Sequence, residues 1–186
     1  MFNLGGRMSG NFYLFSAFAS AFRCDLLSGR GFAATLVACS MFASWTGDAV
    51  AETIRLTGKT ALGIEHDVTL DEIDRIGAAE EKVYNPYEKL RVRYSGVMLD
   101  QFVAKYGDPS VTSIKVIAID DYRITFEKAE WQEFRILLVT KLRGERFGLE
   151  QKGPARIVFA DFSPDEAAHR AKLPKWLWMI QEISFE

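Results

Sequence analysis

Residues 112–126 read TSIKVIAIDDYRITF and form the most regular pattern in the chain. Apolar and polar side chains alternate through Thr112–Ile119 and again through Tyr122–Phe126, which is typical of two half-buried β-strands. Asp120-Asp121 separates the two runs, and aspartate tolerates the backbone geometry of tight turns. The segment therefore predicts a β-hairpin.

The sequence after this hairpin alternates strands with short helical segments. We expect a helical turn at 127–132, strands at 134–142 and 156–159, and a closing strand at 178–185. Arg143-Gly144 and Gly153-Pro154 supply turn signals between them. Ser163 is expected to cap a short helix that Pro174 ends.

The sequence before the hairpin follows the same scheme. We expect strands at 52–57 and 89–94, the second ended by Ser95-Gly96. Thr69 with Glu72 predicts a capping box that opens a helix ending near Gly77, and residues 98–106 form an amphipathic helix ended by Gly107. The order predicts one α+β domain at residues 52–186, a mixed sheet with short helices.

Residues 1–51 are expected to be a cleaved signal region. Positive charge at Arg30 precedes the apolar run 31–42, and Ala49-Val50-Ala51 places small residues where a signal peptidase reads them. We therefore expect an exported, periplasmic protein cleaved near Ala51. The alternative is a lipoprotein anchored at Cys39.

The composition of the predicted domain argues against nucleic-acid binding and thiolate chemistry. Residues 52–186 carry 20 Lys and Arg against 23 Asp and Glu, so clustered basic charge for nucleic acid is not expected. Both cysteines, Cys24 and Cys39, precede residue 52, which leaves no thiolate in the domain. His66 and His169 are expected at the surface, and Glu127, Glu130 and Glu133 on a solvated helical face.

Four motifs occur in a characteristic order. They are Tyr94-x-Gly96-Val97-x-Leu99, Asp120-Asp121-Tyr122, Gly153-Pro154-x-Arg156-x-Val158, and Lys175-Trp176-Leu177 followed by Ile180 and Ile183. With these motifs the domain resembles the molybdopterin-binding domain of the sulfite oxidase type, in particular its small exported single-domain branch. The resemblance implies the mixed-sheet fold of that family.

One difference from this family concerns the ligand that holds its metal. The family holds molybdenum with a cysteine thiolate upstream of the Tyr-x-Gly-Val segment, and residues 77–93 contain no cysteine. The hydroxyl of Ser95 is a poor substitute for the soft ligand that this site selects. We therefore expect no molybdenum and no covalently bound cofactor, and the prediction leans away from an enzyme.

The resemblance implies a pterin-like ligand and a set of residues that could hold it. They are Asp120, Asp121, Tyr122, Arg156, Lys175, Trp176 and Trp178. Arg156 would donate to a ligand carbonyl or hydroxyl, Asp121 would accept from the pyrimidine edge, and Tyr122 with one of the two tryptophans would stack. Each also has a structural interpretation: turn formation for the aspartates, packing for the aromatics, and a carboxylate partner for Arg156.

Three functions remain open at this point. The first is a periplasmic protein that binds a pterin and signals to the periplasmic domain of an inner-membrane protein, with control of cyclic-di-GMP implied by the resemblance. The second is a subunit of a molybdopterin-dependent oxidoreductase. The third is a ligand-free periplasmic adaptor that recognises its membrane partner by surface alone.

Overall fold

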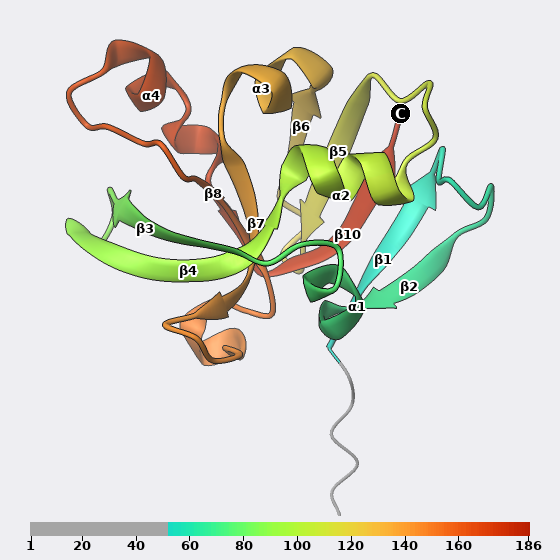
Figure 1. Ribbon diagram of the computed structural model, residues 1–186, viewed down its shortest axis with the longest axis horizontal. Helices are drawn as coiled ribbons and strands as arrows, with labels where there is room; N and C mark the ends of the chain where they lie inside the picture. Colours follow the sequence, from blue (N-terminus) through green and yellow to red (C-terminus); the bar gives the residue numbers. More distant parts are fainter. Residues whose placement is uncertain (1–51) are drawn as a thin grey trace, which may run out of the picture. The chain divides into compact units, whose positions relative to one another are not determined.

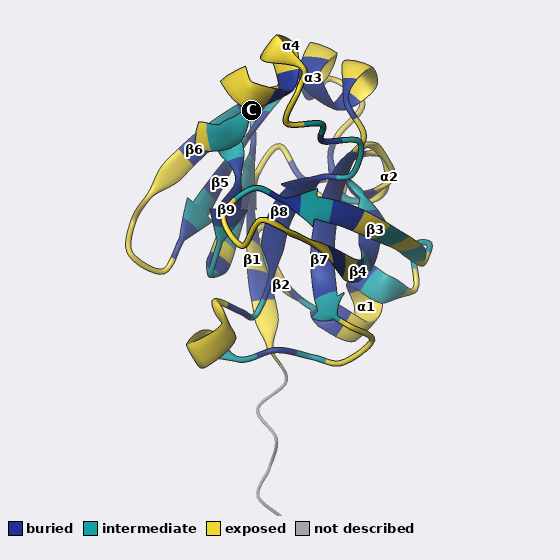
Figure 2. Ribbon diagram, turned by 90° about the vertical axis from the view of Figure 1, so that its left-hand side faces the viewer, coloured by how far each residue is buried: buried dark blue, intermediate teal, exposed yellow. Residues whose placement is uncertain are grey.

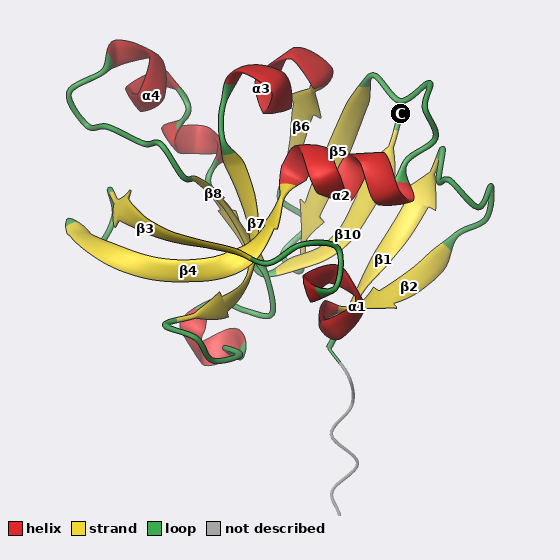
Figure 3. Ribbon diagram, viewed as in Figure 1, coloured by secondary structure: helices red, strands yellow, loops and turns green. Residues whose placement is uncertain are grey.

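The computed structural model describes residues 52–186, so the predicted signal region and Cys39 lie outside the described residues. These residues form two five-stranded sheets with short helices (Figures 1 and 3), which confirms the α+β prediction. No helix within this range is long and apolar enough to cross a membrane.

The first sheet has the strand order β2-β1-β10-β5-β6. Its strands are β1 (Thr53–Gly58), β2 (His66–Thr69), β5 (Ser113–Ala118), β6 (Arg123–Glu127) and β10 (Ile180–Phe185). β1 pairs with β10 in parallel, and the other pairs are antiparallel. The predicted hairpin is confirmed as β5–β6, with Ile114, Val116 and Ala118 buried on one face.

The second sheet has the order β3-β4-β7-β8-β9 and is antiparallel throughout. Its strands are β3 (Ala79–Asn85), β4 (Leu90–Met98), β7 (Ile136–Leu142), β8 (Arg156–Phe159) and β9 (Leu177–Trp178). β3 was not predicted, because its sequence AEEKVYN carries charge at its outward positions. β8 is buried along its whole length (Figure 2).

The expectation that Ser95-Gly96 ends a strand is wrong. β4 continues to Met98, with a register shift against β7 between Ser95 and Gly96. A Cβ at Gly96 would overlap the backbone carbonyl of Leu138 on β7. Glycine therefore lets the two strands approach closely at this irregularity.

The closing strand predicted at 178–185 is divided by Met179. This residue has φ 60°, and it separates β9 of the second sheet from β10 of the first. Its backbone bonds a segment next to each sheet: Met179 N donates to Lys152 O in the loop before β8 at 3.3 Å, and Ile119 N, directly after β5, donates to Met179 O at 2.9 Å. Met179 is thus the corner at which the chain passes from one sheet to the other.

The helices are short and lie at the ends of strands. They are α1 (Leu70–Asp74), α2 (Leu99–Tyr106), α3 (Lys128–Glu133), α4 (Ala167–Ala171), and the 3₁₀ segments η1 (Leu149–Gln151) and η2 (Leu173–Lys175). The Thr69–Glu72 capping box is confirmed. The helix expected from Ser163 starts later, at Ala167, and Glu166 rather than Ser163 precedes it.

The core lies where helix α2 meets both sheets. Phe102 of α2 is fully buried and stacks on Phe185 of β10, with ring centroids 6.2 Å apart. The same helix follows directly from β4 and contacts β7. One apolar core therefore underlies both sheets and fixes the loops that carry the candidate site.

Candidate functional site

Three aromatic residues line two neighbouring cavities. Tyr87, Trp176 and Trp178 are shared by a cavity of about 380 Å³ and one of about 370 Å³. The first, here the Tyr122 cavity, is also lined by Asp120, Tyr122 and Pro174. The second, the Arg156 cavity, is also lined by Glu88, Lys152 and Arg156.

The three shared rings pack edge to face. Tyr87 meets Trp178 at 5.2 Å between centroids and 90°, and it meets Trp176 at 6.2 Å and 64°. Such geometry is favourable because the positive edge of one ring faces the negative face of another. The Lys152 ammonium lies 4.6 Å from the centre of the Trp178 ring, a cation–π distance.

Asn85 shapes the turn that brings Tyr87 to the site. Its side-chain oxygen accepts hydrogen bonds from the backbone N–H of Tyr87 at 2.9 Å and of Glu88 at 3.2 Å. Its amide nitrogen donates to the Tyr94 hydroxyl at 2.9 Å and to Glu88 Oε1 at 3.1 Å. The β3–β4 turn is therefore held by one buried side chain.

Two tyrosine hydroxyls bind the η2 segment beneath the aromatic rings. Tyr87 Oη donates to Leu173 O at 2.8 Å. Tyr122 Oη is 3.4 Å from Pro174 O. Because Tyr87 lies in the β3–β4 turn of the second sheet and Tyr122 in the β5–β6 turn of the first, η2 is contacted by turns from both sheets.

Arg156 is a buried cation without an acidic partner. Its side chain is 6% exposed, and no carboxylate of the described residues lies within 4.0 Å of it. Nη2 donates to Gln151 O, while Nε has no hydrogen-bond partner. The guanidinium carbon lies 4.8 Å from the centre of the Phe147 ring and 5.8 Å from that of Tyr94.

The Arg156 environment also affects a neighbouring phenol. Burial raises the pKa of Tyr94, against the opposing effects of the Arg156 charge and the hydrogen bond from Asn85. Tyr94 therefore stays a neutral phenol at neutral pH. A second donor, Trp176 Nε1, is also buried without a partner. Two N–H donors on residues lining the Arg156 cavity thus lack acceptors, which is uncommon for buried polar groups.

Five of the seven predicted ligand residues are brought together. Asp120, Tyr122, Trp176 and Trp178 line the Tyr122 cavity, and Arg156 joins both tryptophans in the other. Both tryptophans line the cavities, because residues two apart in an extended segment share a face; Trp176 is buried in the core and Trp178 is half-buried. Sequence reasoning missed Tyr87, whose only signal was the preceding Asn85-Pro86 turn.

The other two predicted residues lie elsewhere. Asp121 lines neither cavity; it takes φ 63° in the turn, and its carboxylate is exposed 3.6 Å from Arg123. Lys175 donates to Thr125 O at 2.9 Å and to Glu130 Oε2 at 2.6 Å. Asp121 therefore has a structural role in the β5–β6 turn, and Lys175 has a structural role in fixing η2.

Two predictions of surface residues are wrong. Glu130 is only 9% exposed, because it accepts hydrogen bonds from Lys172 and Lys175. His169 is 8% exposed, and its Nδ1 accepts from Ser163 N at 2.8 Å. The lysine partners of Glu130 lie 42 and 45 residues along the chain, and the His169 ring packs against Phe134 and Phe162.

The domain offers no thiolate site for molybdenum. Within residues 52–186 there is no cysteine, and no group of three or more His, Cys, Asp or Glu side chains is placed to hold a metal ion. The donor set at the candidate site is aromatic, cationic and carboxylate in character. These residues therefore do not fit a thiolate-bound molybdenum centre.

Comparisons with known proteins find matches among solved structures alone. No family model and no curated protein matches the chain. Among solved structures, the sulfane dehydrogenase SoxCD from Paracoccus pantotrophus aligns with 13% identity and a TM-score of 0.49. The alignment covers 72% of this chain and 37% of that one, so the chain spans little more than a third of its length. At this identity and TM-score, we assign no function to this chain from the likeness.

Proposed function

We propose that residues 52–186 bind a planar heteroaromatic small molecule that carries hydrogen-bond acceptors, and that a pterin is such a ligand. The observation that carries the proposal is the buried, acid-free guanidinium of Arg156 beside an aromatic cavity. A desolvated cation without an acidic partner is costly, and an acceptor from a ligand would offset part of that cost.

The shape and chemistry of the cavities support this ligand class. Volumes near 370–380 Å³ fall within the range of about 300–1,000 Å³ typical of small-molecule pockets. The half-exposed Trp178 offers a flat surface for stacking. A pterin has a carbonyl acceptor that suits Arg156 and an amino-bearing edge that suits the carboxylate of Asp120 or Glu88.

The biological role in the proposal is binding and signalling. The protein would be exported, would bind the ligand in the periplasm, and would report the bound state to the periplasmic domain of an inner-membrane protein. We include control of cyclic-di-GMP because the family resemblance of the four sequence motifs implies it. The proposal includes no catalytic step.

Titration calorimetry with neopterin, biopterin and their tetrahydro forms tests the proposal. Loss of one charge-assisted hydrogen bond is worth about 1.5–3 kcal/mol, so Arg156→Gln should weaken binding about 10–150-fold. Arg123→Gln is the matched control, since Arg123 is exposed and lines neither cavity.

The adjacent aspartates supply a second matched pair. Asp120→Ala removes a carboxylate that lines the Tyr122 cavity, whereas Asp121→Ala removes one that lies outside it. We expect weaker binding only for Asp120→Ala. If wild-type protein binds none of the pterins, the proposal is wrong and the ligand-free adaptor gains support. Stoichiometric molybdenum in protein purified from its native periplasm would instead favour the oxidoreductase subunit.

A further inference from the structure

Glu130 connects helix α3 to the segment beneath the aromatic site. Its Oε1 accepts from Lys172 Nζ at 2.8 Å, and its Oε2 accepts from Lys175 Nζ at 2.6 Å. These two lysines flank Leu173 and Pro174. One carboxylate therefore fixes both ends of the η2 segment.

The lysines are themselves held against the core. Lys175 Nζ also donates to Thr125 O on β6 and lies 5.2 Å from the centre of the Phe126 ring. Lys172 Nζ lies 4.9 Å from the centre of the Phe134 ring. Cations in these partly buried positions are stabilised mainly by the single acid between them, because both have Glu130 as their ion-pair partner.

The carbonyls between the two lysines contact the ring residues of the site. Leu173 O accepts from Tyr87, and Pro174 O lies 3.4 Å from the Tyr122 hydroxyl. Trp176 follows directly, and its backbone N–H donates to Leu173 O at 3.1 Å. A displacement of η2 would therefore move Tyr87, Tyr122 and Trp176 together.

We propose that Glu130 is a positioning residue for the aromatic site: through Lys172 and Lys175 it holds η2 where Tyr87, Tyr122 and Trp176 form the walls of both cavities. Glu130 lines neither cavity and would not touch a ligand there. The part of this proposal that concerns ligand binding rests on the proposed function, whereas the part that concerns the position of η2 is independent of it.

Hydrogen exchange of ligand-free protein tests the positioning directly. In Glu130→Gln, a peptide covering residues 172–178 should exchange about tenfold faster, while a peptide covering β5 should keep its wild-type rate. Glu133→Gln is the matched control, because Glu133 is an exposed acid on the same helix. Equal acceleration of every peptide would show a general loss of stability and overturn the proposal, as would no change in residues 172–178.

A second variant covers the case in which Glu130→Gln fails to fold. Lys175→Met keeps an apolar stem but removes one of the two ammonium groups and its contact with Thr125 O. It should produce the same local acceleration in residues 172–178. Wild-type exchange in this variant would overturn the proposal.

Titration with the same pterins completes the test. If η2 is in place in about a tenth of Glu130→Gln molecules, the apparent affinity falls about tenfold, with no change in Glu133→Gln. Faster exchange without weaker binding would contradict a role in binding. If wild-type protein binds no pterin, the proposed function fails, and the exchange result still decides whether Glu130 positions η2.

Discussion

Arg156 illustrates how one side chain joins packing to recognition. It occupies a buried position on β8 and is paired across the strands with Trp178 on β9. Aromatic faces at Phe147 and Tyr94 stabilise the charge in part, since cation–π contacts are worth about 0.5–2 kcal/mol. The remaining donor capacity at Nε is unused. A residue buried in this way stabilises the domain less than an apolar side chain would, which fits a role in binding.

Single residues also mark the limit of sequence reasoning. Arg156, Trp176 and Trp178 were named because the family resemblance implies a pterin-like ligand and these are residue types that could hold it. Asp120 and Asp121 look alike in sequence, and only the φ of 63° at Asp121 separates them in space. Glu130 could not be predicted as buried, because its lysine partners lie 42 and 45 residues away.

Tyr94→Phe tests the buried hydrogen bond that shapes the Tyr87 turn. The change leaves one N–H of Asn85 Nδ2 without its acceptor at 2.9 Å, while the other still donates to Glu88 Oε1. We expect the free energy of unfolding to fall by about 1–2 kcal/mol. Urea unfolding followed by tryptophan fluorescence measures the change. Tyr122→Phe is the control, since its exposed hydroxyl makes only a long contact; an equal loss in the control would contradict the argument.

Elements with local signals were predicted well, and those without them were missed. The β5–β6 hairpin, helix α2 and the α1 capping box all depend on residues within a few positions of one another. β3 and β9 depend on pairing with strands already formed, and their own patterns are irregular or too short. The break at Met179 has no local signal, because methionine rarely takes a positive φ.

Gly96→Ala tests the close approach of β4 and β7. The added methyl group would overlap the Leu138 carbonyl, a backbone atom that can move only with its strand. We expect a loss of about 1–3 kcal/mol of unfolding free energy, or insoluble protein.

Gly77→Ala is the control for the strand contact, because its methyl group would meet only the flexible end of the Gln101 side chain. It should change stability by about 0.5 kcal/mol or less. If both alanine variants unfold at the same urea concentration, the strands do not need glycine at position 96.

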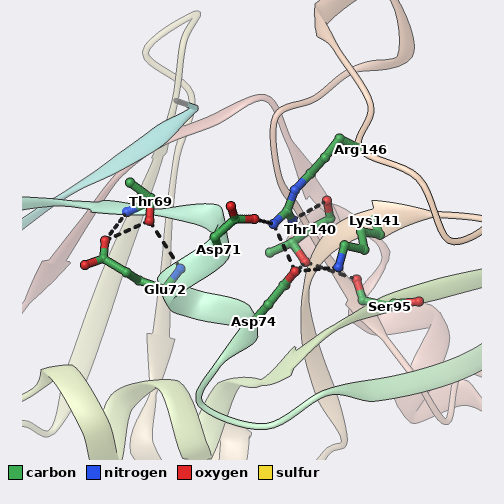
Figure 4. A network of polar contacts seen from close by, with 8 residues as sticks. All are labelled: Thr69, Asp71, Glu72, Asp74, Ser95, Thr140, Lys141 and Arg146. Atoms are coloured by element: carbon green, nitrogen blue, oxygen red, sulfur yellow. Dashed lines mark hydrogen bonds and ion pairs between the residues drawn. The ribbon is translucent and has the colours of Figure 1, made fainter. Parts of the chain in front are cut away.

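At the scale of the molecule, two carboxylates, partly buried Asp74 and buried Glu130, connect parts of the chain that are distant in sequence. Figure 4 shows Asp74 of α1 facing Thr140, Lys141 and Arg146. Lys141 Nζ and Arg146 Nη2 lie 2.8 and 2.9 Å from Asp74 Oδ2, and Thr140 donates to Oδ1. Glu130 does the same between α3 and η2. Each of these acids joins segments more than 40 residues apart.

These two carboxylates predict acid sensitivity of the whole domain. Burial alone would raise the pKa of Asp74, but hydrogen bonds from Lys141 and Thr140 and the charge of Arg146 lower it below the usual 3.8. Burial would likewise raise the pKa of Glu130. The hydrogen bonds from Lys172 and Lys175 outweigh burial and lower this pKa below the usual 4.5. The folded state thus binds fewer protons than the unfolded chain, so this stability is present above about pH 4.5 and is lost as pH falls through the folded pKa values.

Urea unfolding between pH 7 and pH 3 measures this loss. The wild-type midpoint should fall steeply below about pH 4.5, as Asp74 and Glu130 take up protons on unfolding. The double variant Asp74→Asn, Glu130→Gln should be less stable at pH 7, because Lys141, Lys172 and Lys175 lose their acidic partner and Arg146 keeps only Asp71. Its midpoint should nevertheless depend less on pH in the acid range. Glu133→Gln should follow the wild-type curve, since that acid is exposed. A double variant that keeps the wild-type slope would show that acid stability is set by other carboxylates, and that these two do not act as the main links between the segments they join.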